Sequence, residues 1–332
     1  MAVRKTVLFL IRDKLGDSLI AANVALQFAR RRPDWDVAVM IRRAYAFPLA
    51  HEPEIEIVPY RSGVQIRLLT WWWWLRRRKF DVLGVMRGFG GRALALIRSI
   101  PARRVVVHDG RLATLATEVV GSCENPGEDP HYGPAWRVAR ALDRDLPEPT
   151  DLRFPGLIKR WEKAPKRFVA VCPLSDELRR NMPALAIEAL CDTLQLRYPD
   201  RQVLVLVRQH ADLRAYPQPP QVAITEFRTL PRLIELLGQC SHFFGTDTGL
   251  LHLAMAMGLP STVFFGPTQP HRVLPVNQAK IVALRSSALG DRHCDIKSCT
   301  SALCIAQAVA IYAAGKETLC EPSTPGCPLK GT

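Results

Sequence analysis

The sequence has no run of apolar residues close to the ~20 that a membrane-spanning helix requires. Its first apolar run, residues 6–11 (TVLFLI), is too short for a signal peptide and leads directly into charged residues. A G-x-G-x-x-G loop is also absent, because the loop after this run (RDKLGD, residues 12–17) holds a single glycine. These absences argue against an integral membrane protein and a nicotinamide-dependent dehydrogenase, and they predict a cytoplasmic protein.

Acidic residues are scarce relative to basic ones: 31 Asp and Glu stand against 45 Lys and Arg, a formal net charge of +14. Such a charge attracts anionic partners, which include nucleic acid, acidic lipid and phosphorylated glycans, although a solvated basic surface would also explain it. The sequence lacks any recognised nucleic-acid motif and has no aromatics interleaved on a basic strand. We therefore expect no nucleic-acid partner.

The nine cysteines include no C-x2-C pair, the spacing typical of zinc ribbons. Five of them lie near the C-terminus, at Cys294, Cys299, Cys304, Cys320 and Cys327. Three interpretations remain open for these five: reduced thiols, a structural metal site that fastens the tail, or disulfides formed on oxidation. The other four, Cys123, Cys172, Cys191 and Cys240, are predicted core residues because their neighbours are largely apolar.

Strand-like apolar runs alternate with helical stretches along the whole chain, which predicts an α/β protein with parallel sheets. The runs cover residues 6–11, 37–41, 55–59, 81–86, 105–108, 168–172, 202–207, 222–225, 243–245, 261–265 and 280–284. A length of 332 residues suggests two domains. We predict Rossmann-like domains at residues 1–155 and 156–315, a hinge in the proline- and charge-rich segment 146–166, and a cysteine-containing tail at 316–332.

Residues 242–268 (HFFGTDTGLLHLAMAMGLPSTVFFGPT) hold the strongest functional signal. They predict a strand at 242–245, a helix at 249–257 capped by Asp247 or Thr248, a stop at Gly258 and a strand at 261–265. The helix start would direct free N–H groups and a positive dipole end at a ligand above the sheet. An ordinary βαβ unit is the simpler interpretation, but it does not explain why so many polar residues gather at one helix start.

Asp17 occupies a similar place after the first predicted strand, where open α/β sheets bind ligands. The residue is also well placed to cap the helix that follows, and a cap is a common use of aspartate. Considered alone, the loop favours the capping role.

These segments resemble glycosyltransferase family 9, the ADP-heptose:lipopolysaccharide heptosyltransferases. The D-T-G-x-x-H motif of the family is matched by Asp247, Thr248, Gly249 and His252, its G-P-T turn by Gly266, Pro267 and Thr268, and its Gly-Asp loop by Gly16 and Asp17. Segment 80–92 matches a family strand at Phe80, Asp81 and Gly88, with Val85 and Arg87 in place of the usual Asp and Gln. In segment 172–183, Leu174 replaces a family glycine, and Arg179 or Arg180 must stand in for a lysine that contacts the diphosphate.

The resemblance implies a GT-B fold, in which two Rossmann-like domains face each other across a cleft, and an inverting transfer of heptose from ADP-heptose without a catalytic metal. Asp17 would be the catalytic base. The donor-binding residues would be Ser175, Arg179, Arg180, Thr246, Asp247, Thr248, Gly249, His252, Gly266, Pro267 and Thr268. The acceptor-binding residues would be Arg12, Lys14, Gly16 and Arg61. His252 could instead be a packing residue of its helix.

The expected acceptor is an anionic glycolipid of the Kdo-lipid A type, in the inner core of lipopolysaccharide. The enzyme would then be peripheral on the inner face of the cytoplasmic membrane. Trp71–Trp74 point around the whole circumference of a helix, so at least one of them should meet solvent, a subunit or a membrane. Membrane docking and plain packing both remain open for this segment.

Two other functions remain open. Family relatives that heptosylate autotransporter adhesins carry a C-terminal iron site bound by cysteines, which keeps a protein acceptor in view. A non-catalytic basic module that binds membrane or nucleic acid is the second alternative.

Overall fold

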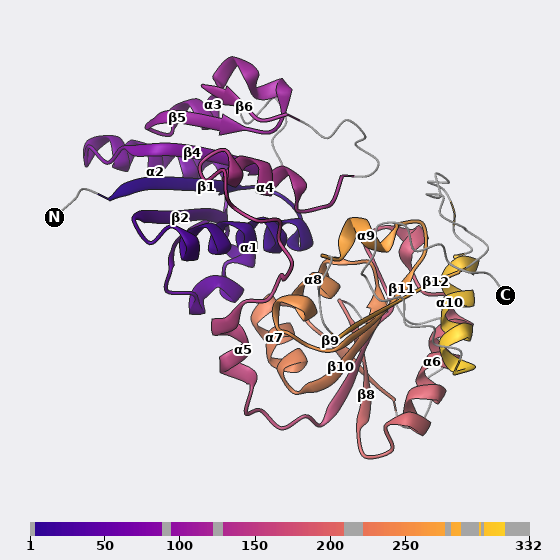
Figure 1. Cartoon of the computed structure of the whole chain (residues 1–332). Helices are drawn as coiled ribbons and strands as arrows, with labels where there is room; N and C mark the ends of the chain where they lie inside the picture. Colours follow the sequence, from indigo (N-terminus) through magenta and orange to yellow (C-terminus); the bar gives the residue numbers. More distant parts are fainter. Residues whose placement is uncertain are drawn as a thin grey trace. The chain divides into compact units, whose positions relative to one another are not determined.

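The computed structural model describes residues 4–87, 94–121, 129–208, 222–275, 280–286, 299 and 302–315. The chain forms two compact units, an N-terminal unit of residues 1–149 and 154–157 and a C-terminal unit of residues 150–153 and 158–332. Each unit contains one six-stranded parallel sheet with helices packed against it (Figure 1). The predicted α/β architecture of two Rossmann-like parts, typical of GT-B, is confirmed. The predicted tail at 316–332 and Gly88 lie outside the described residues.

The sheet of the N-terminal unit has the strand order β3-β2-β1-β4-β5-β6. The order reverses between β1 and β4, where Ile11 pairs with Arg87, so ligands are expected at the carboxyl ends of these two strands. The elements of this unit are β1 (Lys5–Ile11), α1 (Leu15–Arg31), β2 (Trp35–Arg42), β3 (Ile55–Tyr60), α2 (Gly63–Leu75), β4 (Phe80–Arg87), α3 (Leu94–Ser99), β5 (Ala102–Val107), β6 (Glu118–Val119) and α4 (Gly133–Arg140), with short 3₁₀ turns at Arg43–Tyr45, Phe47–His51 and Gly110–Leu115.

The sheet of the C-terminal unit repeats this plan with the order β12-β11-β10-β7-β8-β9. Here the reversal falls between β7 and β10, which pair Cys172 with Gly245. After α5 (Pro155–Trp161), which runs from one unit into the other, the elements are β7 (Phe168–Cys172), a 3₁₀ turn (Leu178–Arg180), α6 (Ala184–Arg197), β8 (Gln202–Val207), β9 (Val222–Glu226), α7 (Leu230–Gly238), β10 (Cys240–Thr246), α8 (Gly249–Ala256), β11 (Ser261–Phe265), α9 (Pro270–Val273), β12 (Ile281–Arg285) and α10 (Leu303–Ala313).

The predicted strands are present, and most agree with the structure to within two residues at each end. The strands predicted at 105–108 and 243–245 begin three residues earlier, because Ala102 already pairs with Phe80 of β4 and Cys240 with Phe168 of β7. The two-residue strand β6 was not predicted, since so short a strand has no alternation to reveal it.

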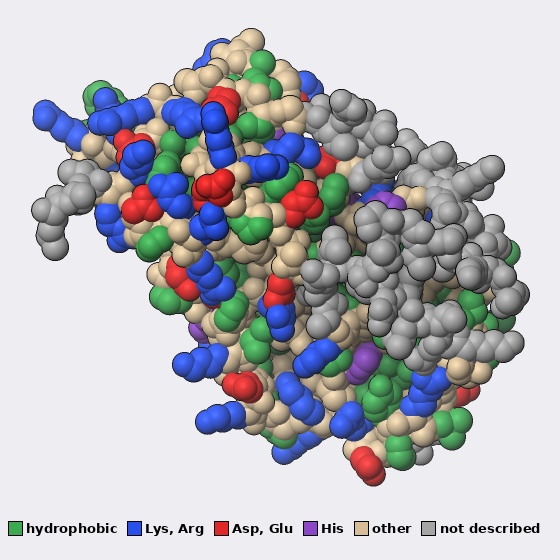
Figure 2. All heavy atoms as spheres, viewed as in Figure 1, with side chains coloured by type: hydrophobic (Ala, Val, Ile, Leu, Met, Phe, Trp, Pro, Cys, Tyr) green, Lys and Arg blue, Asp and Glu red, His purple; other side chains and the backbone are tan. Residues whose placement is uncertain are grey.

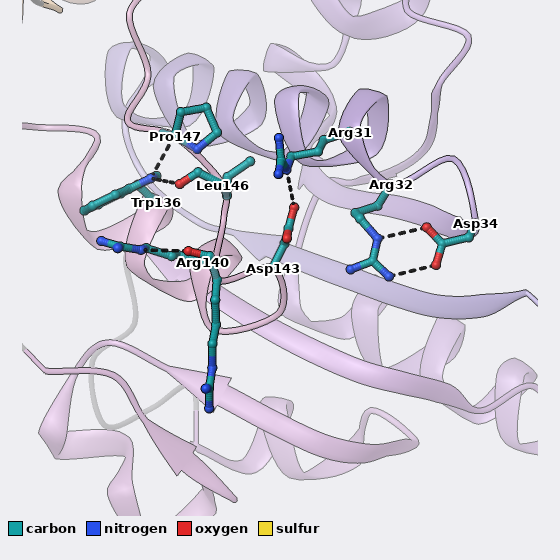
Figure 3. Close-up of polar contacts among 9 residues, drawn as sticks. Arg31, Arg32, Asp34, Trp136, Arg140, Asp143, Leu146 and Pro147 are labelled. Atoms are coloured by element: carbon teal, nitrogen blue, oxygen red, sulfur yellow. Dashed lines mark hydrogen bonds and ion pairs between the residues drawn. The ribbon is translucent and has the colours of Figure 1, made fainter.

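Helices α1 and α4 lie together and are held at their C-terminal ends by polar contacts (Figure 3). Arg31 of α1 forms a 2.7 Å ion pair with Asp143, which follows α4 and is 9% exposed. The indole Nε1 of Trp136 donates to the carbonyl oxygen of Pro147 at 2.9 Å. The ion pair joins the end of α1 to the segment after α4, and the packing of α4 along α1 determines which residues lie near the N-terminal ends of both helices.

The described cysteines agree with the core prediction. Cys172, Cys191 and Cys240 are buried, and burial raises the pKa of Cys191 and of Cys240 to about 12 and that of Cys172 well above its usual value. Cys299 and Cys304 are partly buried, whereas the remaining cysteines lie outside the described residues. Within the described ranges no cluster of three His, Cys, Asp or Glu side chains is suited to a metal ion.

No described helix has the length and apolarity needed to cross a bilayer. The four tryptophans of α2 meet different environments: Trp73 is 2% exposed, whereas Trp71, Trp72 and Trp74 are 61%, 44% and 69% exposed. The prediction that one helix face cannot bury all four is confirmed.

Gly258 ends α8 in a left-handed conformation, with φ +65°. Its N–H donates to the Met255 carbonyl and the Leu259 N–H to the Ala254 carbonyl, the two bonds of a Schellman motif. We expect Gly258→Ala to lower the free energy of unfolding by about 1–2 kcal/mol, because a Cβ is strained at this φ and would lie 3.0 Å from the Cδ1 atom of Ile158. Urea unfolding measures the loss.

Gly315→Ala is the matched control, since Gly315 has φ +68° and open space where its Cβ would lie. Gly315→Ala should lower the free energy of unfolding only by the cost of placing an alanine at a positive φ. A Gly258→Ala variant as stable as the wild type would contradict the role given to this glycine.

Candidate active site

Three loops of the C-terminal unit lie side by side, because β7, β10 and β11 are adjacent parallel strands. They follow the strands at residues 173–181, 247–248 and 266–269. All the predicted donor-binding residues lie in these loops, at the last residue of β10, or in α8. The sheet therefore brings them to one edge, at the strand-order reversal.

Thr248, and not Asp247, caps α8. Its side-chain oxygen accepts a hydrogen bond from the Leu250 N–H at 3.2 Å, and its carbonyl accepts from Leu251 at 3.1 Å. The Gly249 N–H has no hydrogen-bond partner within the described part of the chain. The helix start therefore offers a backbone donor and a positive dipole end to an anion.

Arg180 joins the loop after β7 to the D-T-G loop. Its Nη1 lies 3.0 Å from Oδ2 of Asp247 and donates to the Asp247 carbonyl at 3.3 Å. The Asp247 side chain is only 4% exposed, so this charge is taken from water and neutralised by the arginine. Because it pairs with Arg180, Asp247 is not a bare negative charge facing a diphosphate.

Arg179 has a different environment. Its Nε donates to Oε2 of Glu177 at 3.2 Å, and Arg180 Nε lies 3.2 Å from the same oxygen. The two arginines thus share one carboxylate, Glu177, which is 38% exposed. Of the two candidates for the family lysine, Arg180 is the one that reaches the D-T-G loop.

Ser175 shapes this loop by local hydrogen bonds. The Ser175 N–H donates to Oδ1 of Asn181 at 2.6 Å, and the hydroxyl accepts from the Glu177 N–H at 3.2 Å. Asn181 was not among the predicted site residues, because the motif as read from the sequence drew attention only to the arginines. The Asn181 side chain thus holds Ser175, near the start of the loop, against the end of the loop.

Two buried hydroxyls at this edge have no hydrogen-bond partner among the described residues. They belong to Thr246, 1% exposed, and Thr268, 3% exposed. A buried polar group left unsatisfied costs about 1–3 kcal/mol, so a polar ligand that reaches these oxygens would recover that cost. His252 is also buried on α8, at 5% exposure. Gly266 and Pro267 are buried in the turn that leads to Thr268.

In the N-terminal unit the helix cap differs from the prediction. Lys14 occupies the cap position of α1, and Asp17 lies inside the first turn. The expectation that Asp17 caps α1 is therefore wrong, because the helix begins at Leu15, before Asp17 could act as a cap. A carboxylate in this turn still interacts favourably with the helix dipole. The Asp17 side chain is 24% exposed at the carboxyl end of β1.

His131 lies close to Asp17, with 3.9 Å between Nδ1 and Oδ1. The histidine precedes α4 and is 21% exposed. Sequence reasoning missed it because no motif surrounds it, and it reaches Asp17 only through the packing of α4 along α1.

The predicted acceptor residues follow two strands of the N-terminal sheet, β1 and β3. Arg12 follows β1 and Arg61 follows β3, while Lys14 is exposed and Gly16 is buried in α1. Tyr60 donates from its hydroxyl to the Ile11 carbonyl at 3.1 Å. Burial raises the pKa of Tyr60, and the positive charges of two arginines oppose the rise. These arginines are Arg42 and Arg12, and Arg42 was not among the predicted residues.

Residues 213–303 match the model of glycosyltransferase family 9 (heptosyltransferase), which supports a glycosyltransferase. None of the curated proteins compared with the sequence matches it.

Solved structures match nearly the whole chain. A family 9 glycosyltransferase from Veillonella parvula is 15% identical, with a TM-score of 0.71 over 95% of this chain and 98% of that one. E. coli heptosyltransferase WaaC with ADP is 13% identical, with a TM-score of 0.71 over 94% and 99%. E. coli ADP-heptose lps heptosyltransferase II is 17% identical, with a TM-score of 0.64 over 94% and 99%. At these identities the likeness shows the fold.

The D-T-G-x-x-H and G-P-T motifs both fall inside the matched segment. The resemblance inferred from them is therefore confirmed: the segment that holds both motifs matches glycosyltransferase family 9 (heptosyltransferase).

Proposed function

We propose that this protein is an inverting glycosyltransferase that transfers a heptose from ADP-heptose to an acceptor in the lipopolysaccharide inner core. The observation that carries the proposal is the convergence of Arg180, Asp247 and the capped start of α8 at one strand-order reversal. Asp17, at the matching reversal of the other sheet, supplies a base.

In the proposed reaction the hydroxyl oxygen of the acceptor attacks the anomeric carbon of the donor, while Asp17 accepts the proton of that hydroxyl. The new carbon–oxygen bond forms as the bond from that carbon to the diphosphate oxygen breaks, and ADP leaves with the electron pair. Attack from the face opposite the leaving group inverts the anomeric centre. General-base assistance of this kind contributes about 10²–10⁴-fold to the rate.

The leaving diphosphate requires positive charge and hydrogen-bond donors. The Gly249 N–H and the dipole of α8 supply one set, and Arg180 supplies another from the facing loop. Asp247 holds Arg180 in place by the 3.0 Å ion pair, and its oxygens are also suited to sugar hydroxyls. We infer that these groups meet the need for charge without a metal ion.

The choice of donor and acceptor draws on the similar proteins and on charge. One of the similar solved structures is an ADP-heptose lps heptosyltransferase, and another is heptosyltransferase WaaC with ADP. The N-terminal unit carries arginines at three adjacent strand ends, at Arg12, Arg42 and Arg61, which suits a phosphorylated glycolipid. Such an acceptor would place the enzyme at the inner face of the cytoplasmic membrane.

A protein acceptor is the second candidate. Dodecameric iron-containing heptosyltransferase TibC, in complex with ADP-D-beta-D-heptose, matches 95% of this chain with a TM-score of 0.58 at 15% identity. Incubation with ADP-heptose and either a Kdo-lipid A precursor or a co-expressed adhesin separates the two acceptors by mass shift.

Nucleotide selectivity tests the donor assignment. We expect ADP and ADP-heptose to bind in calorimetry, UDP and GDP to bind at least tenfold more weakly, and transfer to survive EDTA. The reason is that the proposed donor is an adenine nucleotide and that protein groups carry the leaving charge. A preference for UDP would contradict the proposed donor.

A further inference from the structure

Helix α2 packs on the sheet of the N-terminal unit through a single narrow stripe. Ile66, Thr70 and Trp73 are its buried residues, spaced so that they share one helix face. Trp73 packs edge-on against Phe80 of β4, with ring centroids 5.1 Å apart. Ser62 caps the helix by accepting from the Gln65 N–H. The helix is therefore firmly placed, with its outer side left uncovered.

The outer side of α2 is apolar. Six of the eleven large hydrophobic side chains exposed among the described residues belong to this helix: Val64, Leu68, Trp71, Trp72, Trp74 and Leu75. Val64, Leu68, Trp71 and Leu75 recur at i, i+4, i+7 and i+11, which places them in one line opposite the buried stripe. Trp72 and Trp74 flank this line. Exposed apolar groups gathered in this way mark an interaction surface.

Cations border the apolar line. Residues 61–79 contain Arg61, Arg67, Arg76, Arg77, Arg78 and Lys79, and no Asp or Glu. The Arg76 guanidinium lies over the Trp72 ring at 5.0 Å, and only Arg78 has an acidic partner recorded, Glu56 at 2.6 Å. Figure 2 shows that Lys and Arg side chains outnumber acidic ones over the visible face of the N-terminal unit. A helix with exposed tryptophans and uncompensated cations suits the interface of an anionic bilayer.

We propose that the outer side of α2 docks on the surface of an anionic phospholipid bilayer, with the helix parallel to the membrane plane. The tryptophans and leucines would enter the headgroup region, and the cations would meet lipid phosphates. Self-association through the same face would bring two sets of uncompensated cations together, which disfavours a second copy as the occupant. This proposal rests on the proposed function in one respect: a lipid-linked acceptor would give the protein a reason to contact a membrane.

The test is flotation with vesicles of phosphatidylcholine mixed with phosphatidylglycerol, compared with phosphatidylcholine alone. The wild type should float with the anionic vesicles, and its tryptophan emission should shift to the blue. Trp71→Ser combined with Leu75→Ser should weaken binding about tenfold, because two exposed apolar groups are lost. Arg76→Gln combined with Arg77→Gln should weaken it more than tenfold, since each cation near an anionic surface strengthens binding roughly fivefold.

Leu185→Ser combined with Leu196→Ser is the matched control, since these residues are 80% and 84% exposed on α6 of the other unit. This control should float as the wild type does. Equal flotation of the α2 variants and the wild type, or equal binding to neutral vesicles, would overturn the proposal. So would a dimer in sedimentation velocity that the Trp71→Ser and Leu75→Ser changes abolish.

ADP binding by the same proteins separates this proposal from the enzymatic one. All the α2 variants should bind ADP as the wild type does, because α2 lies in the unit that lacks the donor loops. A wild type that floats with anionic vesicles but binds no ADP would contradict the proposed function and support docking. A wild type that binds ADP and does not float would contradict docking and leave the proposed function supported.

Discussion

Asp17→Asn is expected to lower kcat by about 10²–10⁴-fold and to leave the affinity for ADP unchanged. An amide of nearly the same shape keeps the side chain in the first turn of α1 but cannot take a proton from the acceptor. The donor loops belong to the other unit, so nucleotide binding should not change. Steady-state transfer and calorimetry with ADP, performed on one preparation, measure both effects.

Asp13→Asn is the matched control for this substitution. Asp13 lies in the same loop, and its Oδ1 accepts from the Lys14 N–H at 2.8 Å, a bond that an asparagine oxygen can keep. This variant removes the same charge and should retain most of the activity. Undiminished turnover by Asp17→Asn would remove the base assignment, and an equal fall in both variants would indicate a general effect of loop charge.

Arg180→Met is expected to affect stability and donor binding together. Loss of the guanidinium leaves the Asp247 carboxylate buried, at 4% exposure, without its ion-pair partner. Removing one member of such a pair costs about 3 kcal/mol of unfolding free energy, toward the low end because the Arg180 side chain is 20% exposed. The affinity for ADP should fall roughly ten- to hundredfold, since a charge-assisted bond to the diphosphate is lost. Urea unfolding and calorimetry measure the two losses.

A second substitution separates the two roles of Arg180. Adding Asp247→Asn to Arg180→Met removes the uncompensated charge, so most of the stability should return while ADP affinity stays low. Arg179→Met is the matched control: its partner Glu177 is 38% exposed, and the pair contributes at most about 1 kcal/mol. Recovery of ADP affinity in the double variant would contradict a direct contact between Arg180 and the diphosphate.

The strands and the motif loops were predictable because their signals are local. The apolar runs at residues 168–172, 202–207 and 261–265 match β7, β8 and β11 at both ends. The stop at Gly258 follows from the chemistry of a single residue with positive φ. Helix caps were less certain, since Asp247 and Thr248 have similar capping propensities and only the hydrogen bond to Leu250 distinguishes them.

The sequence by itself determined the α/β alternation, the two motif loops and the position of Asp17 after the first strand, because apolar period and turn chemistry act over a few residues. Only the tertiary structure decided which residues meet across longer separations. It paired Arg180 with Asp247, brought His131 to Asp17 and buried Trp73 alone among its neighbours. Strand order and helix packing create these contacts, and neither can be predicted from the pattern of residues within a short segment.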